Sequence, residues 1–377
     1  FIDFIFSNSL VVIATTNVNG EVDPCGWPKK PLGGLARKAT ILAEYNIAEF
    51  NNLFVVDAGD LFFKKNIIDP GVSIETARLN AEIILSSFNK MGCDAFSPGS
   101  KDFASGLDYL IGLNNKSKFP FISCNIADKW GGLLFDSHII KRINKTYIGI
   151  IGATSFFENN IDGLKILDPI NSIDLIISKI ESKVDIIILL INGSDDDIKE
   201  IYKNNSSIDL IIRSGSTSGP KSGSIDGGNK TPTYFAGDRG KYLYQLDMKL
   251  VDDKYPFIDI PWCNNTIDRM NKRLDKMKKG DLNIDLKYLY KDDQTTLNRI
   301  KNYERQIEIA NQRYENAINT ISLKKIELGK TIFDRPDILK IVDKGKIKIK
   351  ELIGPELPPG PDHKGRLPGD PHYNHGH

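Results

Sequence analysis

Residues 10–42 read LVVIATTNVNGEVDPCGWPKKPLGGLARKATIL, and this stretch decides the fold. It predicts a buried strand over residues 10–14, a polar turn that ends at Gly20, a loop, and a helix that begins after Gly33 and Gly34. In open α/β sheets, ligands bind where such strands end and the chain turns. The stretch therefore predicts an α/β domain with a candidate site just after its first strand.

The same alternation of apolar strands and amphipathic helices continues to about residue 250 and predicts an α/β fold. Strands are expected at residues 10–14, 53–57, 94–98, 119–124, 147–152, 185–191, 209–212, 233–236 and 241–250. Helices are expected at residues 35–50, 73–91, 107–113 and 173–182, with a further one that starts at 195–197. Ser73 is the expected cap of the second helix.

The bulk composition narrows the function classes. A net charge of +1 over 377 residues gives no reason to expect nucleic acid as a partner. No apolar run reaches the roughly 18 residues that a membrane-spanning helix needs. The four cysteines lie far apart and form no Cys-x-x-Cys pair, so we expect buried free thiols, with one disulfide as the alternative: Cys25, Cys93, Cys124 and Cys263.

The pattern changes from Cys263 onward. Ile267, Met270, Leu274 and Met277 follow heptad spacing, and a second such seam runs over residues 300–321, so a helical hairpin or short coiled coil is expected. Its seam packs either on the α/β body, or on a partner helix or in a dimer. One more helix is expected over residues 337–352. The resulting division is an α/β domain (1–250), a linker (251–262), a helical region (263–352) and a Pro/Gly/His tail (353–377).

Six loops at the expected strand ends carry polar or glycine-rich motifs. They are Asn17-x-Asn19-Gly20, Asp57-x-Gly59-Asp60, Gly99-Ser100-Lys101-Asp102-Phe103, Asn192-Gly193, the Gly/Ser loop at 213–219, and Phe235-Ala236-Gly237-Asp238-Arg239-Gly240-Lys241. Their order and spacing resemble those of the calcineurin-like metallophosphoesterases, above all the bacterial periplasmic 5′-nucleotidases, over about residues 8–250.

The first loop is similar to that of a narrower subgroup of nucleotidase-like proteins. These proteins carry Pro-Cys-Gly-Cys, some with selenocysteine, followed by Gly-Gly-Leu-Ala-Arg. The second run is complete here at residues 33–37, whereas the first run departs from the pattern at Trp27. Cys25 remains and either acts alone, pairs with another cysteine, or is an inert buried thiol.

The resemblance implies a sheet sandwich covered by helices, an extracytoplasmic location, and a centre in which two metal ions clamp a phosphate and activate a water. The family's ligand pattern falls on positions that mostly carry other side chains: Asn17, Asn19, Asp60, Ser100, Lys101, Asn192, Gly215 and Thr217. Only Asp60 is a strong ligand, because neutral amides replace carboxylate and imidazole poorly. Lys101 puts a positive charge where a cation should sit. Asp60 is then either a ligand or a structural turn aspartate.

Two further clusters leave alternatives open. Lys101, Arg213 and Arg239 either form a metal-free anion pocket or are solvated loop residues. The tail histidines either bind Zn, Cu or the haem iron of a partner, or belong to a structural arm or a disordered end: His363, His372, His375 and His377.

These observations favour a catalytically degenerate 5′-nucleotidase-like protein, an extracytoplasmic binding or scaffolding subunit. We expect no cofactor apart from the metal or partner haem open at the tail histidines, and a protein partner that contacts the helical region and the tail. The alternatives are an active metal-dependent phosphoesterase with an atypical site, and an accessory subunit of an electron-transfer assembly with a haem protein.

Overall fold

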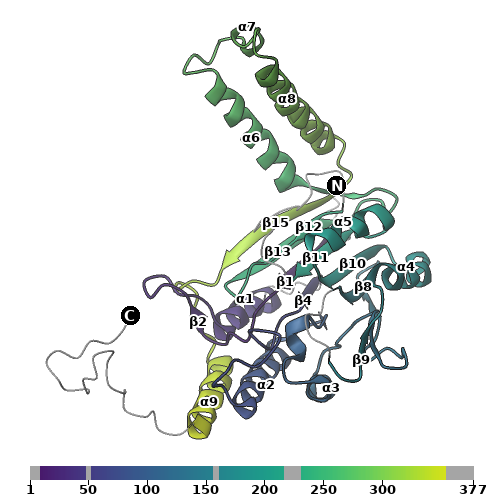
Figure 1. Ribbon diagram of the computed structural model, residues 1–377, viewed down its shortest axis with the longest axis vertical. Coiled ribbons are helices and arrows are strands. Elements are labelled where there is room, and N and C mark those ends of the chain that lie inside the picture. The colour runs from purple at the N-terminus through teal and green to yellow at the C-terminus, as the bar shows by residue number, and fades with distance from the viewer. Residues whose placement is uncertain (1–8, 48–51, 156–160, 216–230, 354–377) are drawn as a thin grey trace, which may run out of the picture.

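The computed structural model describes residues 9–47, 52–155, 161–215 and 231–353. Two β-sheets pack face to face, and helices cover their outer faces (Figure 1). The predicted α/β sandwich covered by helices is confirmed. In the part of the chain that the structure describes, no helix combines the length and the apolar character needed to cross a bilayer.

The first sheet contains the opening strand at its centre. Its order is β14-β15-β13-β1-β4-β5. Strand β1 (Ser9–Thr15) runs parallel to β4 (Leu53–Asp57), which runs parallel to β5 (Ala95–Phe96). On its other side β1 pairs antiparallel with β13 (Tyr242–Lys249). Because β1 is buried from Leu10 onward, it reads as a continuous apolar run, as strands covered on both faces do.

The second sheet has the order β12-β11-β10-β8-β7. Strand β10 (Ile186–Asn192) runs parallel to both β8 (Thr146–Thr154) and β11 (Leu210–Ser214). Strand β12 (Thr233–Tyr234) and the antiparallel strand β7 (His138–Ile143) form the edges. One apolar core fills the space between the sheets, with buried side chains from both: Val12, Phe54, Val56, Ile150, Ile188, Leu190, Ile212 and Leu246.

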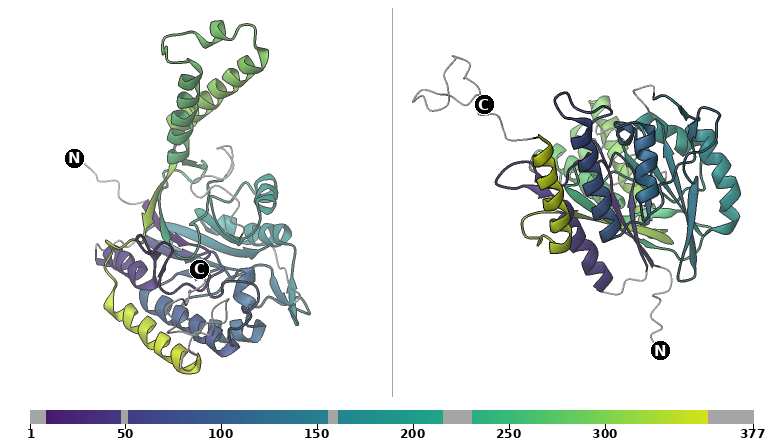
Figure 2. Two further views of the ribbon diagram at one scale, coloured as in Figure 1. Left: turned by 60° about the vertical axis from the view of Figure 1, so that its left-hand side comes forward. Right: turned by 90° about the horizontal axis from the view of Figure 1, so that it is seen from below.

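Helices bury one apolar face each against the outer sides of the sandwich (Figure 2). The first sheet is covered by α1 (Leu35–Ile47), α2 (Ile74–Met91), α3 (Leu107–Lys116) and α9 (Pro336–Ile353). The second is covered by α4 (Pro169–Ile180) and α5 (Asp195–Asn204). The predicted cap of α2 is confirmed, because the Ser73 side chain accepts a hydrogen bond from Thr76 N.

Short elements complete the body. They are β2 (Pro24–Cys25), β3 (Leu32–Gly33), β6 (Ile126–Asp128), β9 (Leu164–Ile166), and the 3₁₀ turns η1 (Ser100–Phe103) and η2 (Glu181–Lys183). The strand predicted at 119–124 is wrong. Phe121 and Ile122 make only isolated bridges, to Phe96 and Asp136, so the segment crosses from one sheet to the other without a ladder.

A helical hairpin interrupts the first sheet. Strand β14 (Phe257–Asp259) leads directly into α6 (Ile260–Met277), followed by α7 (Leu286–Leu289), α8 (Gln294–Glu315) and the return strand β15 (Asn319–Glu327). Strands β14 and β15 are neighbours and run parallel, so the hairpin is an insertion between two adjacent strands. It stands out from the body (Figures 1 and 2).

The hairpin itself is confirmed, but two parts of the C-terminal prediction are wrong. The predicted linker 251–262 contains strand β14, and residues 319–327 of the predicted helical region form strand β15. Ile321 lies at a heptad position and so continues the helical spacing of α8. In the structure it is fully buried in the core between the sheets, and the sheet's two-residue alternation takes over at Asn319.

Candidate functional site

The strand-end loops of both sheets meet at one edge of the sandwich. We define the strand-end cluster as the predicted metal-ligand positions that lie among the described residues: Asn17, Asn19, Asp60, Ser100, Lys101, Asn192 and Gly215. Parallel strands bring these loops together, since β1, β4 and β5 end at the same edge of the first sheet and β10 and β11 end at the same edge of the second. Thr217 lies outside the described residues.

Asn17 links the two sheets. Its Nδ2 donates to the carbonyl oxygen of Gly215 at 3.1 Å, and its Oδ1 accepts from the Gly215 amide at 2.9 Å. The side chain is fully buried. Both polar ends of the amide therefore make hydrogen bonds within the protein. Asn17 thereby holds the loop after β1 against the loop after β11.

Asn192 is satisfied in the same way. Its Nδ2 donates to Ser214 Oγ at 2.8 Å, and its Oδ1 accepts from the Ser100 amide at 3.3 Å. Ser214 Oγ in turn donates to the carbonyl oxygen of Ala58 at 2.6 Å. This chain of hydrogen bonds connects β10 and β11 with the loops after β4 and β5.

Asp60, the one retained carboxylate, is 1% exposed and faces Lys101. Its Oδ1 accepts from the Lys101 amide at 3.1 Å, and its Oδ2 lies 3.3 Å from Lys101 Nζ. The same ammonium group donates to Asn19 Oδ1 at 2.9 Å. Asn19 and Asp60 both have positive φ, at 54° and 57°, which Asn and Asp tolerate better than most residues. The ammonium thus lies between two positions that the resemblance assigns to metal ligands.

Asp102 supports these loops from beneath. Its Oδ1 accepts from the amides of Leu61 and Phe62, each at 2.8 Å. Its Oδ2 accepts from the amides of Asp60 at 2.9 Å and Gly99 at 2.8 Å. Burial and the neighbouring Asp60 carboxylate raise the pKa of Asp102, whereas the four N–H donors favour its charged form.

A second buried network lies at the ends of β1 and β4. Thr15 Oγ1 donates to Asp57 Oδ2 at 2.6 Å and accepts from Lys38 Nζ at 3.0 Å, and the Gly59 amide donates to Asp57 Oδ1 at 3.0 Å. Burial raises the pKa of Asp57 to about 6 and lowers the pKa of Lys38. Sequence reasoning missed this network and the role of Asp102, because neither follows from spacing along the chain.

The cations predicted to bind an anion each have a carboxylate partner. Lys101 faces Asp60, Arg213 pairs with Asp195, and Arg239 binds Glu21 with its Nη2 at 2.6 Å. An anion bound at any of them would compete with an existing ion pair.

The remaining predicted groups are the cysteines and the tail histidines. Cys25 is half-buried, and burial raises the pKa of its thiol, so the group is not activated as a nucleophile. All four cysteines are free thiols, which excludes the alternative of one disulfide among them in this structure. The tail histidines lie outside the described residues: His363, His372, His375 and His377.

The residues of the strand-end cluster do not fit a dinuclear metal centre. The cluster offers one carboxylate, two of its amides are held by protein hydrogen bonds, and an ammonium group faces the carboxylate. Over the described ranges, no three His, Cys, Asp or Glu side chains are grouped so as to hold a metal ion. Divalent transition metals bind imidazole, thiolate and carboxylate far better than neutral amides.

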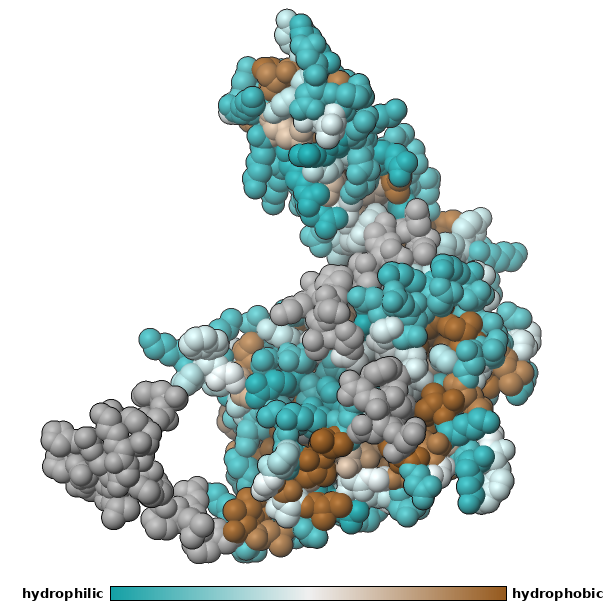
Figure 3. All heavy atoms as spheres, viewed as in Figure 1, coloured by the Kyte–Doolittle hydropathy of each residue, from teal (hydrophilic) through white to brown (hydrophobic). Residues whose placement is uncertain are grey.

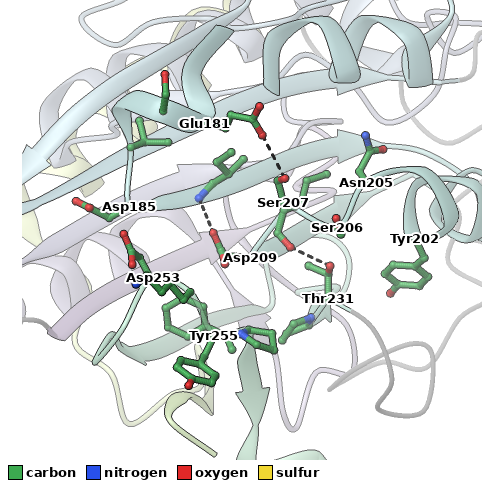
Figure 4. A pocket seen from close by; sticks show the side chains of 18 of the residues that line it. Glu181, Asp185, Tyr202, Asn205, Ser206, Ser207, Asp209, Thr231, Asp253 and Tyr255 are labelled. Carbon is green, nitrogen blue, oxygen red and sulfur yellow. Dashed lines mark hydrogen bonds between the residues drawn. The ribbon is translucent and has the colours of Figure 1, made fainter. Parts of the chain in front are cut away.

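Among the hollows that the described residues form, two lie on the body of the protein. One, of about 690 Å³, lies where β10 and β11 begin and is lined by Tyr202, Asp209 and Arg313 among others (Figure 4). Asp209 accepts from the Ile187 amide at 2.8 Å there, and burial raises its pKa to about 7. The other, of about 340 Å³, is a groove with a mixed polar and apolar lining that includes Asn19 of the cluster. Neither hollow is lined by the retained carboxylate.

Comparison with known proteins supports the fold and the resemblance. A trifunctional nucleotide phosphoesterase of Bacillus subtilis, YfkN, is 23% identical over 284 residues, which are 64% of this chain and 19% of that protein. A 5′-nucleotidase of Vibrio parahaemolyticus is 29% identical over 181 residues, 46% of this chain and 29% of that protein. The chain therefore spans less than a third of the length of either relative. No family model matches it.

Solved structures match a larger part of this chain than the sequence relatives do. The calcineurin-like phosphoesterase YfkN from Bacillus subtilis superposes with a TM-score of 0.61 at 16% identity, over 92% of this chain and 99% of that one. The sulfate thiohydrolase SoxB of Thermus thermophilus gives 0.62 at 13% identity, over 91% and 61%. The fold is that of the calcineurin-like phosphoesterases. The sequence relatives are nucleotide phosphoesterases, so the comparisons point to the phosphoesterase and 5′-nucleotidase family.

Proposed function

We propose that this protein is a catalytically degenerate 5′-nucleotidase-like protein that serves as an extracytoplasmic binding or scaffolding subunit. The observation that carries the proposal is the chemistry of the strand-end cluster. Two-metal phosphoester hydrolysis needs ions that clamp the phosphate and lower the pKa of a bound water. Here the positions for the ligands are occupied by amides, a serine, a threonine, a glycine and a lysine, with Asp60 the one carboxylate.

The hydrogen bonds explain why the fold persists without the ions. Asn17 joins the two sheets through Gly215, and Asn192 joins two strands of the second sheet to the loops of the first. Each buried amide has partners, so the loops are held by direct protein contacts. Such a site suits a stable scaffold better than a catalyst.

The helical hairpin supplies a surface for a protein partner. Helices α6 and α8 pack on each other through a buried seam that includes Met270, Ile300 and Ala310. Figure 3 shows a mostly hydrophilic hairpin surface with apolar side chains gathered near its tip. Leu282 and Tyr288, both in the connection between α6 and α8, are 63% and 73% exposed. These two exposed side chains on a protruding arm are the candidate contacts for a protein partner.

Metal content and turnover test the loss of catalysis together. The purified protein would be incubated with Mn²⁺, desalted and analysed for bound metal, then assayed with a nucleoside monophosphate and p-nitrophenyl phosphate. We expect well under one ion per chain and no turnover above buffer. About two ions per chain together with turnover, both lost in Asp60→Ala, would establish the active phosphoesterase instead.

A photo-crosslinking amino acid tests the binding role in the native cell. Placed at Tyr288 it should form discrete protein adducts, whereas placed at Leu175, an exposed apolar residue of α4 on the body, it should not. Equal adducts at both positions, or none at Tyr288, would contradict a contact through the hairpin.

A further inference from the structure

We propose that the Lys101 side chain is an internal replacement for the cation of this site, so that its ammonium group neutralises Asp60 and joins the loops that metal ions would otherwise join. The inference rests on the proposed function in one respect, namely that the strand-end cluster holds no divalent ions. It adds a specific role for one residue.

The geometry places one residue against both oxygens of the carboxylate. The Lys101 amide donates to Asp60 Oδ1 at 3.1 Å, and its ammonium lies 3.3 Å from Oδ2. The ammonium also donates to Asn19 Oδ1 at 2.9 Å. Three loops, those after β1, β4 and β5, therefore meet at a single positive charge.

Burial makes this charge necessary. Asp60 is 1% exposed, and a carboxylate so deeply buried is strongly destabilising unless it is paired. Its Oδ2 has no hydrogen-bond partner among the described residues, so the ion pair with the Lys101 ammonium is its compensating contact. The acidic side chains of Asp57 and Asp102 lie near Asp60 and offer it no positive charge, and the buried ammonium of Lys38 binds Thr15 beside Asp57. Among the residues that the structure describes, Lys101 is thus the cation that pairs with Asp60.

The backbone is arranged to admit the lysine. Gly99 precedes the η1 turn, and a Cβ there would lie 2.4 Å from Asp60 Oδ1 and 2.7 Å from Asn192 Nδ2. Its absence lets the η1 turn approach closely enough for Lys101 to reach back over Asp60. Backbone hydrogen bonds from Asn17 to Gly59 and from Asn19 to Asp60 hold the facing loop in register.

An ammonium group and a metal ion differ in the chemistry that they support. The ammonium group donates hydrogen bonds but has no open coordination position, so it does not lower the pKa of a bound water. It does supply the charge that keeps Asp60 buried. The inference therefore predicts that removal of the ammonium creates a negatively charged space that a soluble cation stabilises.

The test uses Lys101→Met, which keeps much of the stem but removes the charge, with thermal unfolding measured in the presence and absence of MnCl₂. The wild type should show no Mn²⁺-dependent change in Tm. Lys101→Met should lose about 5 °C or more, because removal of the ammonium leaves the buried Asp60 carboxylate without a paired charge. Mn²⁺ should restore at least half of that loss. Lys30→Ala, which breaks an exposed lysine–glutamate pair, is the matched control and should change little.

A double variant keeps the test decisive if Lys101→Met does not fold. Replacing Asp60 by Asn as well removes both charges. The double variant should therefore fold, recover most of the lost Tm and show no Mn²⁺-dependent change in Tm. A double variant less stable than Lys101→Met, or a Lys101→Met protein as stable as the control and indifferent to Mn²⁺, would overturn the inference. Metal binding and turnover by the wild type would instead overturn the proposed function, so the two failures are distinguishable.

Discussion

Replacing Asp102 by asparagine tests the support beneath the site. The Asp102 carboxylate accepts four backbone hydrogen bonds, two on each oxygen. Asparagine keeps the shape but has one oxygen, so two of the four amides lose their acceptor and face an NH₂ group instead. A buried N–H without a partner costs about 1–3 kcal/mol. We therefore expect Asp102→Asn to lower the free energy of unfolding by about 2–6 kcal/mol.

Urea unfolding followed by circular dichroism measures this loss. Asp108→Asn is the matched control, because Asp108 is an exposed aspartate in the first turn of α3. It should lose less than about 1 kcal/mol, the size of a helix-dipole effect. A loss for Asp102→Asn no larger than that of the control would refute the reasoning that the four amides depend on this carboxylate.

Three further changes test other parts of the fold. Ser73→Ala should lower the free energy of unfolding by about 1 kcal/mol, because α2 loses its cap. Gly345→Ala should destabilise by about 1–3 kcal/mol, since the new Cβ would meet the Ile83 side chain at 2.2 Å. Asp209 has a raised pKa of about 7, so the folded state binds its proton more tightly and stability falls as pH rises from about 4 to 7. Asp209→Asn should reduce that fall by about 1 kcal/mol or more in urea titrations across this range. Unchanged unfolding midpoints in the first two variants, or an unchanged pH dependence in the third, would contradict these assignments.

Most strands of the body and the cap of α2 follow from the sequence because they are local, whereas β7 does not and residues 119–124 form no strand. The run LFVVD predicts β4 at residues 53–57, and the structure places it at Leu53–Asp57. The Ser73 cap is signalled by the helix that follows it. Parallel strands also explain why the strand-end loops, far apart in sequence, meet at one edge.

Other features depend on contacts that spacing does not encode. Ile321 fits both a heptad seam and a buried strand, and its partners on β13 decide between them. Asp102 bonds amides up to 42 residues away, and Lys101 meets Asn19 82 residues away. The resemblance to the metallophosphoesterases implies that Lys101 stands at a cation position, but only the folded loops show which groups its ammonium contacts.

A crystal grown or soaked with Mn²⁺, with data collected at the manganese absorption edge, tests the central claim most directly. We predict no anomalous peak beside Asp60 and clear density for the Lys101 ammonium within hydrogen-bond distance of Asn19 Oδ1. Two anomalous peaks bridged by the Asp60 carboxylate, with the lysine displaced, would contradict the account.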